Sequence, residues 1–511
     1  MQPSTLGTIR AYWLGTVVCI GGFLFGYDSG MTQGSVTLVV GAVNSSNAGG
    51  VLTLQSFSSS FHYDTAHKTR VNSLAVGLQQ LGAFLACFIA WPVTNRHGRR
   101  KTLALASAIF VVGAVIQTID THSMGAFYAG RIIAGVSLGA ATVVVPMYSS
   151  EMTPKHLRGQ IGSFFQLNYT IAPQLKYTSG IFVSYWVDYS VLKAVSNQKA
   201  MQWQIPIGLQ IVPAALLGLG MLTLKESTRW LTQKGRHEEA WESLKWIRAS
   251  DAADVVDEME EIRTGVEIEA NVAPELLERS NFKRVFTAFA VFAAQQATGA
   301  TAFAYFGPQY FKLLVGAGDK NLLLTAIFGA VKVVACATFV FFLSERVGRR
   351  QIMTWGAVFM AACQISTAAV VKNIPAPSNG NTTPSGIATV ALIYLFVIAY
   401  NFSWGPLPWP YVSEIFPMRI REPGIAVGVS SQWLFNFVFS LVTPYMIDDM
   451  SWGTFLFWGL ADACIAVGTF AFLKETKGLS LEEIAHTNYD QAKDFEDMES
   501  ERIDHVQVKR I

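Results

Sequence analysis

Long apolar runs occur twelve times along this 511-residue chain. Most have about 20 residues, the length that an α-helix needs to cross the roughly 30 Å hydrocarbon core of a bilayer. Because backbone polar groups must stay paired in hydrocarbon, such runs predict membrane-spanning helices. They lie near residues 11–31, 71–93, 103–119, 125–147, 159–187, 205–224, 285–306, 322–343, 352–371, 387–409, 425–447 and 452–473. The chain is therefore predicted to be an all-α polytopic membrane protein.

Composition supports this placement in a membrane. Hydrophobic residues make up 51% of the chain and charged residues only 14%, which is too apolar for a soluble protein of this size. A formal net charge of +2 indicates no nucleic-acid partner. The five cysteines lie in apolar runs without metal-ligand or disulfide spacing and are interpreted as small core residues: Cys19, Cys87, Cys336, Cys363 and Cys464. We expect no cofactor and no metal.

Charged segments divide the chain into four parts. Residues 225–284 carry many charges, cannot enter a bilayer and are predicted to form a cytoplasmic linker with short amphipathic helices. This linker separates an N-terminal six-helix bundle (1–224) from a C-terminal one (285–473), and a cytoplasmic tail (474–511) follows. Basic clusters occur in alternate loops, so the positive-inside rule places those loops and both termini in the cytoplasm. The expected location is the plasma membrane.

The two halves also resemble each other in sequence. NRHGRR at residue 95 matches ERVGRR at residue 345, and LKESTRWL after the sixth run matches LKETKGLSL after the twelfth. Glu151 precedes Arg158 by seven residues, and Glu414 precedes Arg421 by the same interval. Three matches in the same order indicate a duplicated six-helix unit. Two such units with a site between them are a known transporter plan.

Several motifs resemble those of the sugar porter family of the major facilitator superfamily. In family order along nearly the whole chain they are FGYDSG (25–30), GRIIAG (130–135), PMYSSEMTPKHLRG (146–159), ESTRWL (226–231), QQATGATAFAYFGPQYF (295–311), ERVGRR (345–350), GPLPWPYVSEIFPMRIR (405–421) and ETKGLSLEEI (475–484). The overall style is similar to that of fungal proton-coupled sugar and quinate-type porters. This resemblance implies the major facilitator fold, with two pseudo-symmetric six-helix bundles.

Charged residues at the cytoplasmic helix ends are interpreted as a gate. Arginines and glutamates at repeated spacing can form networks that exist only when the cytoplasmic side is closed, which would favour the outward-open state. A second interpretation, in which the arginines only enforce topology, stays open. Asn95 stands where the family usually has Asp, which should weaken the network of the first half. The predicted gate residues are Arg99, Arg100, Glu151, Arg158, Glu226, Glu345, Arg349, Arg350, Glu414, Arg421 and Glu475.

Two ionisable residues lie inside apolar runs, where a charge is costly and therefore suggests a function. Asp28 lies in the first run and Arg131 near the start of the fourth. The resemblance implies that they face each other and that the aspartate takes up the proton in symporters. Separation of the pair by a conformational change would favour protonation, which couples proton movement to transport. A static ion pair that fixes two helices is the alternative.

Recognition of a hydroxylated ring needs amides for the hydroxyls and aromatic rings for the C–H face. By resemblance, the predicted substrate-binding residues are Phe25, Gln166, Gln295, Gln296, Trp409, Trp433 and Asn436. Core packing is the alternative for Phe25 and Trp433. Thr301 stands where the family usually has a sugar-binding Asn, which is unfavourable for a plain glucose site. Lys332, deep in the eighth run, would suit the carboxylate of a sugar acid or quinate, or is satisfied by carbonyls or an interface.

The fifth run contains a near-repeat, QLNYTIAPQLKYTSG (166–180), and is about eight residues longer than a usual span. We interpret the extra length as an insertion or duplication, with a helix break expected near Pro173 or a helix end displaced beyond the membrane. Gln166 keeps the family's spacing to the preceding arginine, whereas Gln174 keeps the spacing to Gly180. Gln166 is the predicted ligand and Gln174 the alternative, because a straight helix cannot turn both equally toward one cavity.

Together these features predict a secondary active transporter that takes up a monosaccharide or related polyol with protons by alternating access. A proton symporter of a sugar acid or quinate-like anion is the alternative, and a non-transporting nutrient sensor is a third hypothesis. An enzyme is not expected, because no nucleophile, base and orienting residue recur at workable spacing. The expected partners are the substrate, the proton and the lipid bilayer, and the protein is expected to act as a monomer.

Overall fold

The computed structural model has helices in all its described parts. The described residues are 5–33, 55–62, 67–152, 172–196, 199–250, 253–270, 279–315, 320–343, 347–374, 383–416 and 420–475. Within these ranges the regular secondary structure is helical and contains no strand, as predicted. Nine of the spans in these ranges are long and apolar enough to cross a membrane. With α9, the pair α15–α16 and α17 described below, the helices are consistent with twelve crossings.

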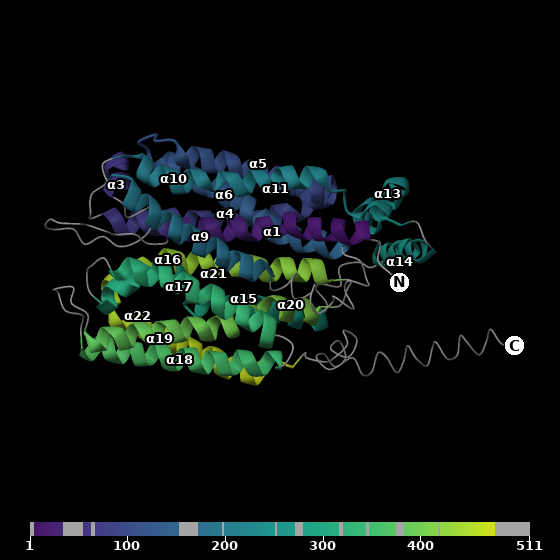
Figure 1. The fold of residues 1–511 in the computed structure, drawn as a ribbon. Coiled ribbons are helices and arrows are strands. Elements are labelled where there is room, and N and C mark those ends of the chain that lie inside the picture. The colour runs from purple at the N-terminus through teal and green to yellow at the C-terminus, as the bar shows by residue number, and fades with distance from the viewer. Residues whose placement is uncertain are drawn as a thin grey trace.

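The first six crossings pack together as one bundle, coloured purple to teal in Figure 1. Its helices are α1 (Thr5–Gln33), α4 (Lys68–His97), α5 (Arg99–Thr118), α6 (Met124–Met152), α9 (Ala172–Ala194), α10 (Met201–Leu209) and α11 (Ile211–Thr223), with the short α3 (Gln55–Phe61) before α4. Helix α6 packs against α4 and α5, and α1 packs against α9. Glycines allow the close approach, since a Cβ at Gly135 or Gly139 of α6 would collide with the α4 backbone.

Three short helices follow this bundle and lie at the same end as the N-terminus (Figure 1). They are α12 (Thr228–Gln233), α13 (His237–Arg248) and α14 (Ala253–Ala270). Ser227 caps α12, because its hydroxyl oxygen accepts a hydrogen bond from the Trp230 N–H. Two arginines bind the helices to the bundle: Arg10 donates to the carbonyl of Trp246 at 2.5 Å, and Arg248 donates to that of Met152 at 3.0 Å. The linker helices are therefore attached to the first bundle.

The remaining crossings form the second bundle, coloured green to yellow in Figure 1. Its helices are α15 (Arg279–Ala297), α16 (Ala300–Val315), α17 (Lys320–Thr338) with its π-helical continuation η3 (Phe339–Leu343), α18 (Arg349–Asn373), α19 (Pro384–Phe402), α20 (Pro408–Ile415), α21 (Arg421–Met450) and α22 (Trp452–Phe472). Helix α18 packs against α19 and α22, and α15 packs against α21. Two six-helix bundles of this kind confirm the predicted fold class.

Two crossings that the apolar runs predict as continuous are interrupted. Between α15 and α16, Gly299 has φ +77°, a left-handed conformation that favours glycine. Between α19 and α20, residues 403–407 form turns in place of regular helix. Hydropathy does not reveal such breaks, because the interrupting residues are themselves small or apolar. Each break leaves backbone carbonyls without helical partners inside the bundle.

The duplicated stretch lies only partly within the described residues. Gln166 and the rest of residues 153–171 lie outside them, so the predicted break before Pro173 is not tested. Pro173 is the second residue of α9, in a first helical turn, where proline needs no N–H partner. Further along α9, a Cβ at Gly180 would collide with the α1 backbone at Phe23 and Tyr27. This contact fixes the depth of α9 beside α1.

The two bundles meet along α4 and α21, α9 and α17, and α1 and α16. Near the start of α4, Thr69 donates a hydrogen bond to Asp448 at 2.7 Å. One turn further along α4, Ser73 donates to the carbonyl of Leu441 at 2.5 Å. These contacts join the ends of α4 and α21 that lie away from the linker helices. The interface between the bundles is therefore formed by α1, α4 and α9 on one side and α16, α17 and α21 on the other.

Candidate functional site

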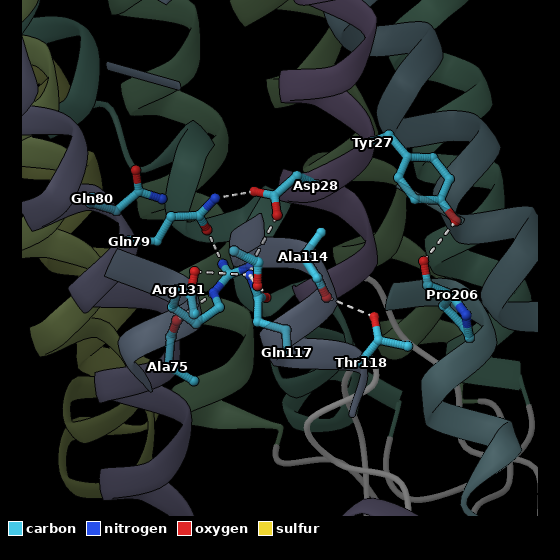
Figure 2. Close-up of polar contacts among 12 residues, drawn as sticks. Tyr27, Asp28, Ala75, Gln79, Gln80, Ala114, Gln117, Thr118, Arg131 and Pro206 are labelled. Atoms are coloured by element: carbon cyan, nitrogen blue, oxygen red, sulfur yellow. Dashed lines mark hydrogen bonds and ion pairs between the residues drawn. The ribbon is translucent and has the colours of Figure 1, made fainter. Parts of the chain in front are cut away.

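Asp28 of α1 and Arg131 of α6 form an ion pair inside the first bundle (Figure 2). Arg131 Nη1 lies 3.0 Å from Asp28 Oδ1, and the two side chains are 0% and 1% exposed. The contact that the family resemblance implies is therefore present. Because the pair is closed to water, a proton can reach the carboxylate only after the pair has rearranged.

Gln79 of α4 completes this pair in a way the sequence analysis missed. Its amide nitrogen donates to Asp28 and its amide oxygen accepts from Arg131, so one side chain bridges both members (Figure 2). Arg131 also donates to the carbonyl of Ala75 at 2.9 Å and to the amide oxygen of Gln117 at 3.4 Å. The sequence signal was the amide pair at residues 79–80 inside an apolar run, which is as unusual there as a charge.

A second polar group joins the two bundles through the hydroxyl of Tyr305 on α16. Gln80 of α4 donates to this oxygen at 3.1 Å, and Asn436 of α21 donates to it at 3.0 Å. The amide oxygen of Asn436 accepts in turn from Ser440 at 3.1 Å. All of these side chains are buried. The predicted ligand Asn436 thus lies at the junction of the bundles, together with Gln80 and Tyr305, which were not predicted.

The two adjacent glutamines of α15 have different surroundings. Gln295 donates its amide N–H groups to the carbonyls of Trp404 at 2.9 Å and Gly405 at 3.1 Å, which the break between α19 and α20 leaves free. Gln296 instead accepts a hydrogen bond from Thr301 Oγ1 at 2.8 Å across the break between α15 and α16. Thr301 therefore has a local partner in this conformation. Gln295 joins two broken crossings, a structural role beside the predicted one.

The predicted aromatic residues lie on both bundles. Phe25 of α1 contacts Trp433 of α21, with ring centroids 5.1 Å apart. The Trp433 indole N–H donates to Thr142 of α6 at 3.1 Å. Trp409 of α20 is half-buried and meets Phe292 edge to face, with centroids 5.0 Å apart. Phe25 and Trp433 thus pack across the interface of the bundles, where a substrate path between them would pass.

Lys332 of α17 is 4% exposed and does not reach the surface of the protein. Phe328 and Cys336, one turn away on either side, are also buried. This burial argues against the interpretation that the Lys332 ammonium extends to a membrane interface. Gln166, Arg158 and Glu345 lie outside the described residues, as does the side chain of Arg421.

The first charge cluster, at the end of the bundle that carries the linker helices, consists of Arg99, Arg100, Glu151 and Glu226. Arg99 Nη2 lies 2.7 Å from Glu151 Oε1, with the side chains only 3% and 2% exposed. Glu151 also accepts a hydrogen bond from Ser227, the cap of α12. Glu226 caps α5 by accepting from the backbone N–H of Arg100 at 3.0 Å. The Arg100 side chain donates to the carbonyls of Met221 and Leu222 at the end of α11, each at 3.0 Å.

The second charge cluster repeats this plan and consists of Arg349, Arg350, Glu414 and Glu475. Arg349 Nη2 lies 3.4 Å from Glu414 Oε1, with the side chains 20% and 16% exposed. Glu475 caps α18 through the backbone N–H groups of Arg349 at 2.7 Å and Arg350 at 3.1 Å. The Arg350 side chain donates to the carbonyl of Phe470 at 2.6 Å. In both clusters one arginine pairs with a glutamate while the next arginine binds a helix end.

Asn95 contributes to the first cluster through its backbone. Its carbonyl accepts a hydrogen bond from the Trp230 indole at 2.9 Å, which ties the end of α4 to α12. The predicted weakening of the first-half network by Asn95 is not tested by this contact. Among the described residues, no group of three His, Cys, Asp or Glu side chains could hold a metal ion.

The structure has two six-helix bundles, a buried ion pair inside the first bundle and a polar junction between the two bundles. Together these features define a membrane transporter of the major facilitator class. The chain belongs to the sugar (and other) transporter family, whose model matches residues 14–487. This family consists of transporters, and the chain is accordingly a multi-pass membrane transporter. The predicted family is confirmed.

Curated relatives and solved structures agree with this assignment. The probable quinate permease of Aspergillus clavatus is 32% identical over 499 residues, 94% of this chain and 88% of that protein. The quinate permease of Emericella nidulans is 31% identical over 94% of this chain and 89% of its own. The proton:xylose symporter XylE, solved with 6-bromo-6-deoxy-D-glucose bound, has a TM-score of 0.74 and 24% identity over 94% of this chain and 100% of that chain. An inward-open structure of XylE from E. coli has a TM-score of 0.72 and 23% identity over 93% and 99%. At these identities XylE shows the shared fold.

Proposed function

We propose that this protein is a proton symporter for a small polyhydroxylated ring, working by alternating access. The observation that carries the proposal is the buried Asp28–Arg131 pair with its bridging Gln79. Three side chains from α1, α4 and α6 meet there, so relative movement of these helices changes the partners of the carboxylate. Loss of Arg131 would favour the protonated carboxyl, because a neutral amide such as Gln79 compensates a buried charge less well than a guanidinium does.

Within this class, we propose a cyclic polyhydroxy acid of the quinate type as the substrate. Relatives named quinate permeases support it, because they match 94% of the chain at 31–32% identity. The buried Lys332 supplies a cation inside the second bundle, which suits a carboxylate better than a neutral sugar. Thr301, with its hydroxyl bound to Gln296, offers a shorter group than the family's asparagine. A neutral monosaccharide or polyol is the second candidate, supported by the family as a whole.

The transport cycle follows from these residues. A proton from the outer side would neutralise Asp28, release Arg131 and allow α1 to move relative to α6. Asn436, Gln295 and Gln296 would exchange their present partners for substrate hydroxyls, and Trp409 and Trp433 would cover the ring. The two charge clusters would lie on the cytoplasmic side and act as the gate that closes this side when the outer side is open.

Uptake into proteoliposomes tests the coupling. With an inward proton gradient, we expect wild-type vesicles to accumulate labelled quinate and an uncoupler to abolish accumulation. Asp28→Asn should lose accumulation while keeping exchange of labelled for unlabelled substrate, because exchange needs no net proton movement. Accumulation by Asp28→Asn equal to that of the wild type would contradict proton coupling through this residue.

Substrate choice is tested by Lys332→Met. Removal of one charged hydrogen bond, worth about 1.5–3 kcal/mol, should raise the KM for quinate by roughly 10–100-fold. Transport of a neutral polyol should change little. Lys283→Met, which removes an exposed lysine of α15, serves as the matched control. An unchanged quinate KM in Lys332→Met would show that Lys332 does not bind the carboxylate, and quinate uptake too weak to measure in the wild type would favour the neutral substrate.

Several further features belong to the same proposal. Function as a monomer in a lipid bilayer, location in the plasma membrane and cytoplasmic termini are all compatible with it. Basic residues concentrated at the end that carries the linker helices support this orientation. The division into bundles at 1–224 and 285–473, with linker 225–284 and tail 474–511, is proposed on the same basis.

A further inference from the structure

A pair of polar side chains lies buried between α18 and α22, away from the junction of the two bundles. Asp462 is the central residue of α22, and Gln364 lies near the middle of α18. Both are 0% exposed. Neither oxygen of Asp462 and neither polar atom of Gln364 has a hydrogen-bond partner in the described part of the chain. Four orphaned polar atoms at one helix interface call for a ligand that joins them.

The packing of the two helices brings these side chains to one level. Arg350 near the start of α18 binds the carbonyl of Phe470 near the end of α22, and Lys372 near the end of α18 lies 4.6 Å from the Trp452 ring centroid. The helices are therefore antiparallel. A Cβ on Gly459 would lie 3.1 Å from the Gln364 Cβ, so Gln364 packs one turn before Asp462.

Side-chain direction then turns the two groups toward each other. Side chains on a helix lean toward its N-terminus. In antiparallel helices the lean is opposite, so Gln364 leans along α22 toward the level of Asp462, and Asp462 leans back toward Gln364. The thiol of Cys363, next to Gln364, interacts with Asp462 electrostatically. Among the described residues, no charged side chain of α15, α16 or α21, which also contact α22, does so.

A proton is the ligand that suits this arrangement. An ionised carboxylate at the centre of a membrane helix is costly, and a glutamine amide is a weak partner for a full charge. A protonated carboxyl is neutral and gains an O–H donor, which the amide oxygen of Gln364 can accept. We propose that Asp462 and Gln364 form a second proton-binding site, separate from the pair at Asp28.

This site is connected through Trp458 to α16, the helix that carries the predicted ligand Thr301. Trp458 lies one turn before Asp462 on α22, and its indole donates to Tyr310 of α16 at 3.0 Å. The break at Gly299 packs directly against the Trp458 ring. A change in the spacing of α18 and α22 on proton loss is therefore transmitted to the break between α15 and α16.

Infrared spectroscopy of the purified full chain tests the proposal without requiring transport. Wild type should show a carbonyl-stretch component of a protonated carboxylic acid that is lost in Asp462→Asn. Asp449→Asn, an exposed carboxylate of α21, should leave this component unchanged. Gln364→Leu should keep the component but shift it to higher frequency, because the hydrogen-bond acceptor is gone. If Asp462→Asn leaves the spectrum unchanged, or Gln364→Leu leaves the band in place, the proposal is overturned.

Thermal unfolding in detergent provides a second reading. The unfolding temperature of the wild type should fall with rising pH from the point where this carboxyl ionises in the unfolded chain, because only the native state still holds the proton, and it should level off once native Asp462 ionises. Asp462→Asn should lack this fall, whereas Asp449→Asn should retain it. Stabilisation by sodium at high pH, present in wild type and absent in Asp462→Asn, would overturn the proton in favour of a cation. Since neither measurement depends on substrate, its outcome is independent of the proposed symport.

Discussion

The two charge clusters share one plan but differ in how far their ion pairs are shielded from water. In the first, the Arg99–Glu151 pair is 2.7 Å long and nearly inaccessible to water. In the second, the Arg349–Glu414 pair is 3.4 Å long and several times more exposed. Ser227, the cap of α12, binds the carboxylate of the first pair. The duplicated sequence motif therefore encodes the contacts, while the linker helices decide how deeply one copy is buried.

This difference bears on how a duplicated unit changes its role. A fully buried ion pair keeps its geometry because each charge would be unstable alone. A partly exposed pair can open at a lower cost, because water can solvate the separated charges. The first cluster is thus suited to hold α5, α6 and α12 together as one body. The second is suited to rearrange. Two nearly identical motifs can acquire different stabilities in this way.

The two clusters should differ most in the unfolding free energy that is lost when one carboxylate is removed from each. Glu151→Gln leaves Arg99 buried without its ion-pair partner and should cost about 3–5 kcal/mol of unfolding free energy. Glu414→Gln, in the partly exposed pair, should cost less than this. Denaturant unfolding of both variants in the same detergent measures the two losses. Equal losses would show that exposure does not distinguish the pairs.

The glycines before α5 and α18 allow a finer test. A Cβ at Gly98 or Gly348 would collide with the carboxylate of Glu226 or Glu475, so both alanine variants disturb a helix cap. Only Gly98 has a positive φ, at +95°, in a region that is almost exclusive to glycine. Gly98→Ala should therefore cost about 1–3 kcal/mol more than Gly348→Ala in thermal or denaturant unfolding. A larger loss in Gly348→Ala would contradict this account.

The smallest of these effects concerns the hydroxyl that closes the first cluster. Ser227→Ala removes the cap of α12 and one hydrogen bond to Glu151, and should cost about 1–2 kcal/mol. Thr264→Ala, which removes an exposed hydroxyl from α14, is the matched control and should stay within about 0.5 kcal/mol. Faster proteolysis of the linker in Ser227→Ala than in the control would confirm that this hydroxyl holds α12 in place. Equal rates would assign the sealing to other contacts.

Much of the architecture could be predicted from the sequence because it depends on local patterns, such as apolar runs and repeated motifs. Apolar length predicts a crossing, and the repeated NRHGRR and ERVGRR motifs predict the duplication. The contact of Asp28 with Arg131 could be expected from the resemblance and from the cost of intramembrane charge. These features require the residue type and its place in a run, and little else.

The remaining features depend on geometry that local patterns carry only in part. Gly299 and the Gly405–Pro406 pair favour turns, but the length of each run predicts one continuous crossing and does not reveal that the helix breaks there. Glu226 and Glu475 look like partners for arginine side chains, yet they bind backbone N–H groups at helix starts. Gln79 is visible as an unusual amide, but its place between Asp28 and Arg131 depends on how α4 packs on α6.

The contact of Gly180 with α1 makes this position intolerant of any side chain. A Cβ there would collide with the α1 backbone at Phe23 and Tyr27. Gln174 lies six residues before Gly180 in the same helix. One residue inserted or deleted between them would rotate the start of α9 by about 100° relative to α1, so this single glycine acts as the reference point for the register of the helix.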